Sequence, residues 1–385
     1  MDVKDTNPRM RKDITIIGGS AAGFFTAYVL AREGQRVQLF EAAEDIQLSP
    51  RTLIVTSYIQ NLMGCLCEGA IINKIRRFEL FADGRVATVS LRQADLVIDR
   101  AKLIQRMAAL AEANGAKIRT GCRFLSLKPD GKGLNLRISR NGDGNPIEES
   151  ANILVGADGA FSKVAQRAGW PKQSTVPLFQ AVVELPKDLP SDATRVWFIP
   201  EDTPYFYWLI PHSPTHGVLG LIGEEGQEIR VSLERFLEKK GLEPIEFQNA
   251  RVSRYTQWIP NHRKIGGSHV YLVGDAAGHV KVSTMGGLVP GFQGALAVVE
   301  AILNGGARRE FRLLRRELDR HKLIRRVLHD FTQADYARLL DLLTSSVKRS
   351  LSLFNRDETS KLLLHVFLKQ PHLLLLGLRA LLIGR

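Results

Sequence analysis

Hydrophobic and polar positions divide the start of the chain into a strand, a turn, a helix and a second strand. The run Ile-Thr-Ile-Ile at 14–17 predicts a buried strand, and the small residues at 18–23 predict a tight turn into an amphipathic helix. A second apolar run at 37–40 ends in Glu41. This order of elements is typical of a βαβ unit with a parallel sheet.

The same periodicities recur further along the chain. Residues 97–116 read as a helix with Asp99 as its N-cap and Asn114-Gly115 as its stop signal. Polar residues and turn signals at 128–149 predict a hairpin. The other predicted elements are strands at 117–127, 153–156 and 270–273 and a long helix at 288–303.

The C-terminal region is predicted to be helical. Apolar residues recur near helical spacing through the arginine-rich segment 307–326, which indicates an amphipathic helix with a basic outer face. Residues 361–385 are strongly apolar, but charged residues and Pro371 interrupt them before they reach the roughly 18 residues of a spanning helix. We expect two short helices broken at Pro371, which either pack on the body of the protein or lie in a membrane interface.

Composition sets limits on size and compartment. At 385 residues and 44% hydrophobic content, the chain is long enough for two or three domains. The three cysteines, Cys65, Cys67 and Cys122, make no disulfide framework, and no apolar run follows the charged N-terminus, so a cytoplasmic protein is expected. One residue separates Cys65 from Cys67, which is too few for the usual metal spacing; no metal is expected, and a redox role for this pair is the alternative to a structural one.

A net charge of +13 favours an anionic ligand or surface. Much of this charge lies in 307–326, whose basic face is either simply solvated or attracted to anionic lipid or a phosphorylated substrate. No aromatic and basic platform or groove-reading motif accompanies the charge, so a nucleic-acid partner is not expected.

The turn at 18–23 has the chemistry of a dinucleotide site. Small residues allow the backbone to approach a pyrophosphate, and the helix that follows presents unpaired N–H groups and a partial positive charge. Glu41 lies where a carboxylate can accept hydrogen bonds from a ribose. Serine replaces the second glycine of the usual pattern. The candidate residues in the turn are Gly18, Ser20, Ala22 and Gly23.

Two more strand ends carry an acid beside glycines. The segment 153–159 ends in Asp158 and Gly159, where a second cofactor contact could form. The strand at 270–273 leads into Gly274-Asp275 and, after a short loop, into Gly286-Gly287 and the long helix. Asp275 is placed to bind the ribityl chain of a flavin, and the helix N-terminus would favour the anionic edge of the reduced ring.

These three motifs resemble those of FAD-dependent oxidoreductases of the p-hydroxybenzoate hydroxylase type, over about residues 13–303. The resemblance implies that Glu41 binds the adenosine ribose, that Gly18, Ser20 and Gly23 bind the pyrophosphate, and that Asp275 binds the ribityl side. The residues that it implies along the remaining FAD surface are Arg51, Arg100, Asp158 and Gly159.

Within that superfamily the chain is similar to geranylgeranyl reductase-like enzymes. Their motif matches Gly-Asp-Ala-Ala-Gly at 274–278 with Thr284 and Gly286-Gly287, and their aromatic motif matches Phe-Tyr-Trp-Leu-Ile-Pro at 206–211. Two departures, Val282 for a proline and Met285 for a glycine, could reshape the pocket over the flavin. The pocket candidates are Phe206, Tyr207, Trp208 and Met285.

The expected architecture is α/β, with a Rossmann-like FAD-binding domain, an inserted antiparallel-sheet substrate domain and a helical C-terminal region. The expected boundaries are 10–170 and 262–305 for the two parts of the FAD-binding domain, 171–261 for the substrate domain and 306–385 for the C-terminal region.

The expected activity is hydride transfer from reduced FAD to carbon–carbon double bonds of an apolar, isoprenoid-like substrate. No second nucleotide fold is visible, so NAD(P)H or a protein electron donor would dock transiently. The candidate proton donors are Tyr205, Tyr207 and His279. The alternatives are a monooxygenase or a halogenase acting on an aromatic substrate, and a flavin-binding scaffold or sensor without turnover.

Overall fold

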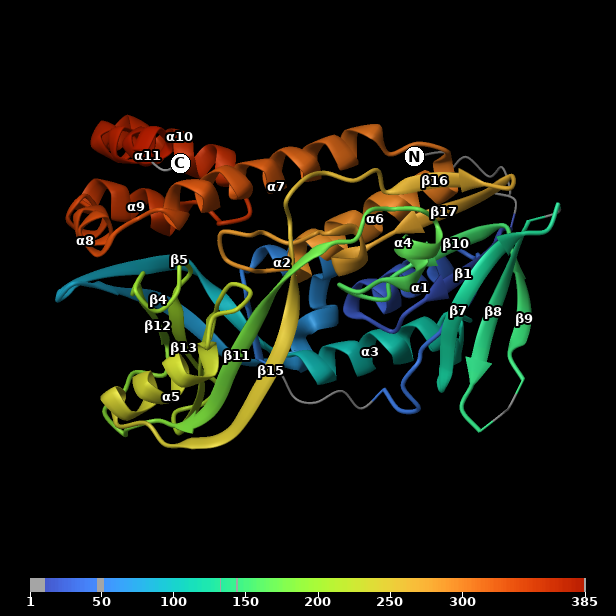
Figure 1. The fold of residues 1–385 in the computed structure, drawn as a ribbon, viewed down its shortest axis with the longest axis horizontal. Coiled ribbons are helices and arrows are strands. Elements are labelled where there is room, and N and C mark those ends of the chain that lie inside the picture. Colours follow the sequence, from blue (N-terminus) through green and yellow to red (C-terminus); the bar gives the residue numbers. More distant parts are fainter. Residues whose placement is uncertain (1–10, 47–51, 132, 143–144, 384–385) are drawn as a thin grey trace, which may run out of the picture.

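The computed structural model describes residues 11–46, 52–131, 133–142 and 145–383. Two large sheets stand next to each other, and a layer of C-terminal helices runs across the top of both (Figure 1). The expected α/β architecture with a Rossmann-like domain is confirmed.

The first sheet has six strands in the order β16-β17-β10-β1-β2-β6. All neighbours pair in parallel except β16 and β17, which form an antiparallel hairpin at the edge. Its central strands are buried on both faces, which explains their continuous apolar runs. The strands are β1 (Asp13–Ile17), β2 (Arg36–Phe40), β6 (Lys117–Arg119), β10 (Ile153–Gly156), β16 (His262–Ile265) and β17 (Ser268–Leu272).

Helices cover one face of this sheet and a three-stranded sheet covers the other. Helix α1 packs between α3 and α6, and aromatic contacts such as Phe25 against Phe292 fill that core. The hairpin expected at 128–149 is present as part of the small sheet. The covering elements are α1 (Ala21–Arg32), α3 (Arg100–Ala113), α6 (Leu288–Asn304), α4 (Lys163–Arg167), β7 (Cys122–Pro129), β8 (Leu134–Arg140) and β9 (Ile147–Ala151).

The second sheet has eight strands in the order β15-β11-β14-β13-β12-β4-β5-β3. Its strands pair antiparallel except β12 and β4, which are parallel. The strands are β3 (Thr52–Val55), β4 (Ile71–Ala82), β5 (Arg85–Asp99), β11 (Ser174–Glu184), β12 (Ala193–Trp197), β13 (Tyr207–Pro211), β14 (His216–Ile222) and β15 (Pro244–Arg254).

Three strands of this sheet come from a segment that the sequence pattern grouped with the FAD-binding domain. The expected sheet at 171–261 supplies five strands, and residues 52–99 supply β3, β4 and β5. The long edge between β4 and β12 joins residues more than a hundred positions apart, for example Arg77 and Ala193. Local periodicity carries no information on such a pairing, so the sequence boundaries and the sheets do not coincide.

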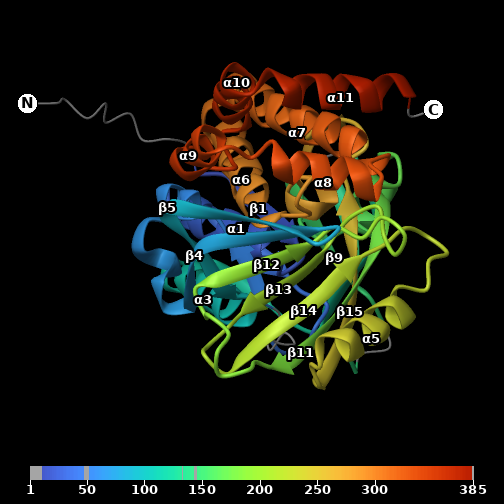
Figure 2. The same ribbon diagram turned by 90° about the vertical axis from the view of Figure 1, so that its left-hand side faces the viewer.

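The two faces of the eight-stranded sheet have different neighbours. Helix α5 (Ile229–Lys240) packs on one face against the side chains of Tyr207, Leu209 and Leu219. The alternate residues, among them Trp208 and Ile210, point to the opposite face. Figure 2 shows α5 below the sheet and the C-terminal helices above it.

Five helices follow α6. The basic segment forms the long helix α7, and the apolar tail forms two helices on either side of Pro371, as expected. Within the described residues, none of the helices combines the length and apolarity needed to cross a bilayer. The remaining helical elements are α2 (Tyr58–Met63), α7 (Arg308–His329), α8 (Gln333–Asp341), α9 (Ser345–Leu353), α10 (Thr359–Lys369), α11 (Pro371–Ile383) and two short 3-10 turns, η1 (Gly64–Ala70) and η2 (Gly274–Ala277).

Candidate active site

The turn between β1 and α1 is built so closely that only glycine fits at two positions. Gly18 has a φ of +106°, and a Cβ there would lie 2.5 Å from the carbonyl oxygen of Ala157. A Cβ on Gly23 would lie 2.2 Å from the carbonyl oxygen of Gly18. The Ser20 hydroxyl caps α1 by accepting from the Gly23 N–H at 3.1 Å. The helix N-terminus is thereby brought to the carboxyl end of β1, where a pyrophosphate would bind.

Glu41 closes the same turn from the end of β2. Its carboxylate accepts from the backbone N–H of Gly19 and, at 2.8 Å, from that of Ala43. The side chain is only half-buried, so it stands at the rim of the turn. Glu41 therefore orders the turn and remains at a position from which it can meet a ribose.

The Asp158 side chain forms its hydrogen bonds within its own loop. Its carboxylate accepts from the Ser162 hydroxyl at 2.5 Å and from the Val164 N–H at 3.1 Å, so it organises the start of α4. Burial raises the pKa of Asp158 despite these hydrogen bonds. Gly159 next to it faces open space, because a Cβ there would meet nothing within 4 Å. Of this pair, Gly159 is the residue that leaves room for a cofactor.

The turn at Gly274-Asp275 contacts the glycine-rich turn that precedes α1. A Cβ on Gly274 would lie 2.9 Å from the Cβ of Ala22, so the Gly274-Asp275 turn packs directly on the start of α1. Asp275 lies beside the start of α6: a Cβ on Gly287 would be 3.1 Å from its Oδ1. Gly287 is the N-cap of α6 and has no side chain with which to cap the helix. The first N–H groups of α6 therefore lie at the same edge of the sheet as the start of α1, where they could meet a ligand.

Of the two arginines that the resemblance implies along the FAD surface, the structure describes only Arg100. Arg100 is the first residue of α3 and is half-buried. It follows Asp99, whose carboxylate caps α3 by accepting from the Lys102 N–H at 3.1 Å, as the sequence predicts. Arg51 lies outside the described residues.

The pocket candidates separate onto two faces of the eight-stranded sheet. Phe206 and Trp208 lie edge to face with ring centroids 6.1 Å apart, and Met285 packs in the same cluster. Met285 has a φ of +52°, a conformation that favours glycine, so this loop is strained at the position where the resemblance predicts glycine. Tyr207 points away: its ring stacks on Phe236 of α5 at 4.2 Å. The expectation that Tyr207 shares the pocket is therefore not met, because strand residues alternate.

The three proton-donor candidates also differ in position. The Tyr207 hydroxyl donates to Asp202 at 2.9 Å, on the α5 side of the sheet. His279 is fully buried, its Nε2 accepts from the Asn261 amide at 2.8 Å, and burial lowers its pKa to about 3. The His279 ring is therefore neutral at physiological pH, and it fills the core instead of donating a proton to a substrate. Tyr205 is buried in the Trp208 cluster, and its hydroxyl has no hydrogen-bond partner among the described residues.

A cavity of about 250 Å³ opens on the Trp208 side of the sheet, toward the far end of the strands. His212 lines it directly after the aromatic strand, and its Nε2 is 2.5 Å from the Thr52 hydroxyl. Burial lowers the pKa of His212. The sequence analysis missed this histidine, although strand alternation from Trp208 would have placed it on the same face. The lining residues are Thr52, Ile72, Asp99, Val182, His212, Val218, Glu246 and Gln248.

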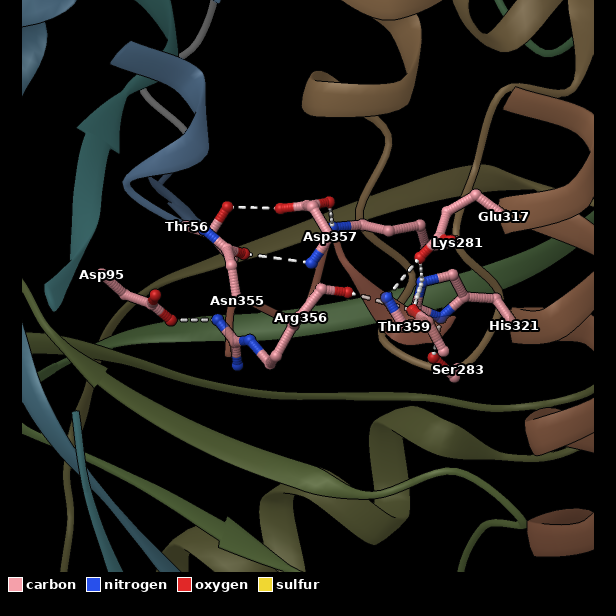
Figure 3. Close-up of polar contacts among 10 residues, drawn as sticks. All are labelled: Thr56, Asp95, Lys281, Ser283, Glu317, His321, Asn355, Arg356, Asp357 and Thr359. Atoms are coloured by element: carbon pink, nitrogen blue, oxygen red, sulfur yellow. Dashed lines mark hydrogen bonds and ion pairs between the residues drawn. The ribbon is translucent and has the colours of Figure 1, made fainter. Parts of the chain in front are cut away.

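A buried polar network connects the third motif with the C-terminal region (Figure 3). Lys281, in the loop before α6, donates to one carboxylate oxygen of Asp357, and the Thr56 hydroxyl donates to the other. The preceding residue, Arg356, pairs with Asp95 of β5. All of these partners are far apart in sequence, and no local pattern marked them.

A second branch of the network reaches α7 (Figure 3). The Ser283 hydroxyl is 2.6 Å from Nδ1 of His321, and the other ring nitrogen faces the Thr359 hydroxyl at 3.1 Å and Glu317 at 3.5 Å. Burial lowers the pKa of His321. The loop before α6 is thus held by two sets of side chains from the C-terminal region.

Comparisons with known proteins identify the family of this chain. A family model described as an FAD binding domain matches residues 11–330. The chain belongs to the FAD-binding domain family. This flavoprotein is 24% identical over 302 residues to the digeranylgeranylglycerophospholipid reductase of Methanococcus vannielii, a match that covers 72% of this chain and 73% of that protein.

Solved structures share the fold. A geranylgeranyl bacteriochlorophyll reductase-like protein from Thermoplasma acidophilum has a TM-score of 0.75 at 18% identity, over 94% of this chain and 97% of that one. The flavin-dependent brominase Bmp2 has a TM-score of 0.68 at 13% identity, over 89% and 92%. The flavoprotein is an FAD-dependent oxidoreductase, as its sequence motifs predict.

The residues present fit FAD. Gly18 and Gly23 keep the first turn free of side chains, and Gly286-Gly287 does the same at the start of α6. Both helix N-termini face the carboxyl edge of the same sheet, which is where doubly wound folds bind their ligands. When bound, FAD would supply the two-electron chemistry of the enzyme, and the two glycine-bordered helix N-termini would hold it.

Proposed function

We propose that this flavoprotein reduces carbon–carbon double bonds of an apolar, isoprenoid-like substrate at the expense of reduced FAD. The observation that carries the proposal is the cluster of Phe206, Trp208 and Met285 on the face of the sheet that meets the loop before α6. Apolar walls of this kind suit a substrate without charges near its reacting bond. The names of its relatives, two of which are reductases of geranylgeranyl lipids or are like them, support the same substrate class.

The chain has two tasks in this reaction. The apolar cluster orients the substrate and excludes water from the reduced cofactor. Tyr205 is the one of the three named proton-donor candidates that lies in this cluster, which supports a role beside the substrate. The electrons come from NAD(P)H or from a protein donor that docks transiently, because the sequence has a single glycine-rich dinucleotide turn.

The test is anaerobic reoxidation of the reduced enzyme by a geranylgeranylated lipid, followed at the flavin absorbance. We expect the lipid to reoxidise the flavin faster than air does. Trp208→Ala should slow reoxidation by the lipid about tenfold, because a substrate that has lost one wall is poorly oriented. Tyr207→Phe is the matched control: its ring lies on the α5 face, so the rate should be unchanged.

Fast reaction with oxygen and a slow reaction with the lipid would contradict the proposal. That outcome would favour the alternative, a monooxygenase or halogenase, to which the shared fold with the brominase Bmp2 gives support. A flavin that accepts electrons from no donor would instead favour a scaffold or sensor.

We further propose that α10 and α11 rest on an anionic lipid surface, from which the substrate is taken. One side of α11 packs on α7 and α8, and the other exposes leucines at Leu374, Leu375, Leu378 and Leu382. Lys361 and Lys369 of α10 and Arg379 of α11 are exposed as well, and the whole chain carries +13. Exposed leucines beside basic residues are complementary to the boundary between acyl chains and anionic headgroups.

Cosedimentation with vesicles tests this contact. We expect binding to phosphatidylglycerol vesicles and much weaker binding to phosphatidylcholine vesicles. The variant with Leu375→Ser and Leu378→Ser should bind about tenfold more weakly or worse, because two buried leucines are lost from the interface. Val231→Ser on α5, a residue about as exposed, is the control. A protein dimer that the leucine variant dissociates, without lipid binding, would overturn the proposal.

A further inference from the structure

The loop between the Gly274-Asp275 turn and α6 is closed on itself by Lys281. Its backbone N–H donates to the Gly286 carbonyl at 3.0 Å, so the two ends of the loop pair as in a short β-bridge. A Cβ on Gly286 would lie 3.4 Å from Cε of Lys281, so the lysine stem runs along the glycines that precede the helix. A displacement of Lys281 would therefore also displace Gly286 and Gly287.

The ammonium group of Lys281 is held from the C-terminal region. It forms an ion pair with Asp357, and the two side chains are only 9% and 3% exposed. Asp357 also accepts from Thr56, which directly follows β3, and its own N–H donates to the Asn355 side chain at 3.0 Å. Asp357 thus ties the loop before α6 to the end of β3 (Figure 3). The loop before α6 ends at Gly286-Gly287, which belong to the expected flavin site.

Stability alone does not explain such a pair. Removing two charges from water is expensive, and an apolar pair of similar volume often stabilises a fold as well or better. Burial alone would raise the pKa of Asp357, but the charge of Lys281 and the hydrogen bonds from Lys281 and Thr56 outweigh it and lower the pKa. The aspartate is therefore charged and satisfied in the folded protein, which suits a role in fixing geometry.

We propose that Asp357 is a positioning residue of the flavin site: through Lys281 it holds Gly286-Gly287 and the N-terminus of α6 in the orientation that binds the FAD ring. The C-terminal region is then part of the cofactor site. This inference rests on FAD binding and is independent of the substrate proposed above.

The experiment compares FAD affinity with the stability of the FAD-free protein. Asp357→Asn and Lys281→Met should each weaken FAD binding about tenfold or more, as loss of a partner behind a direct ligand does. The double variant Lys281→Met with Asp357→Leu replaces the pair by apolar groups. We expect its unfolding midpoint to stay near that of the parent while its FAD affinity remains low. Arg230→Met, which removes an exposed pair with Glu234 on α5, is the matched control and should leave both quantities unchanged.

The reduction potential at saturating FAD gives a second readout. Asp357→Asn leaves a positive charge unpaired near the cofactor and should raise the potential, whereas Lys281→Met leaves a negative charge and should lower it. A double variant that binds FAD like the parent would overturn the proposal, and so would a parent-like affinity in Asp357→Asn, which keeps the shape of the side chain. A fall in the unfolding midpoint without a change in affinity or potential would assign the pair to folding only.

Discussion

Gly23→Ala should yield a protein that no longer retains FAD. The new Cβ would lie 2.2 Å from the carbonyl oxygen of Gly18 and 2.9 Å from the Cβ of Ala157. Both neighbours belong to the backbone or to a side chain without freedom to move, so α1 must shift away from β1. Overpacking of this kind costs about 3 kcal/mol, which is roughly 100-fold in affinity if the cost falls on the bound state.

The measurement is FAD titration of the purified protein by flavin fluorescence, together with its visible spectrum. Gly306→Ala is the matched control, because the same methyl group added there would meet nothing within 4 Å. We expect the control to remain yellow and to bind FAD like the parent. A Gly23→Ala protein with parent affinity would mean that the pyrophosphate does not lie on this turn.

The second large effect is a loss of stability in mild acid caused by His279. Its pKa falls from 6.5 in the unfolded chain to about 3 in the folded protein, because the ring is fully buried. The imidazole Nε2 accepts from Asn261, so an added proton would face a donor. Between these two pKa values the unfolded chain binds the extra proton, so the stabilisation is complete above pH 6.5 and is lost as the pH falls.

From pH 7 to pH 5 this one group should remove about 2 kcal/mol from the free energy of unfolding. Chemical denaturation across that range measures it. His279→Gln keeps an acceptor for Asn261 but has no titrating group. The free energy of unfolding of this variant should therefore fall by about 2 kcal/mol less than that of the parent between pH 7 and pH 5. His372→Gln makes the same substitution at an exposed site and should keep the slope of the parent. Equal slopes in all three proteins would show that folding does not lower the pKa of His279.

The contiguous motifs could be predicted from the sequence because their chemistry is local. Gly18, Gly23 and Glu41 lie within one βαβ unit, whose strand, turn and helix are encoded by neighbouring residues. The same holds for Gly274-Asp275 and for the helix that begins after Gly287. A glycine that a turn requires can be recognised without knowing the rest of the fold.

The side of the sheet on which an aromatic residue lies needed the structure. Phe206, Tyr207 and Trp208 are adjacent in sequence, and alternation sends Tyr207 to α5 and Trp208 to the cluster with Met285. The sequence pattern shows the alternation but not which face meets the cofactor. That choice depends on where the other sheet and the C-terminal helices pack.

Contacts between distant segments could not be predicted at all. Lys281 and Asp357 are 76 residues apart, and neither belongs to a motif that names the other. Lysine and aspartate are usually exposed in proteins, so the residue types of Lys281 and Asp357 do not predict a buried pair. Only the three-dimensional structure reveals it. The pairing of β4 with β12 is hidden in the same way.

The pairing of β4 with β12 also bears on how the chain is made. The hairpin of β4 and β5 is complete once residue 99 has been synthesised, but its partner strand ends at Trp197. At about 5–20 residues per second, the ribosome needs roughly 5–20 s to produce that partner. Throughout this interval β4 presents an unpaired edge, the kind of surface on which strands from other chains add. Slower translation of this stretch should therefore increase aggregation, and chaperones that shield strand edges should be needed most while residues 100–197 emerge.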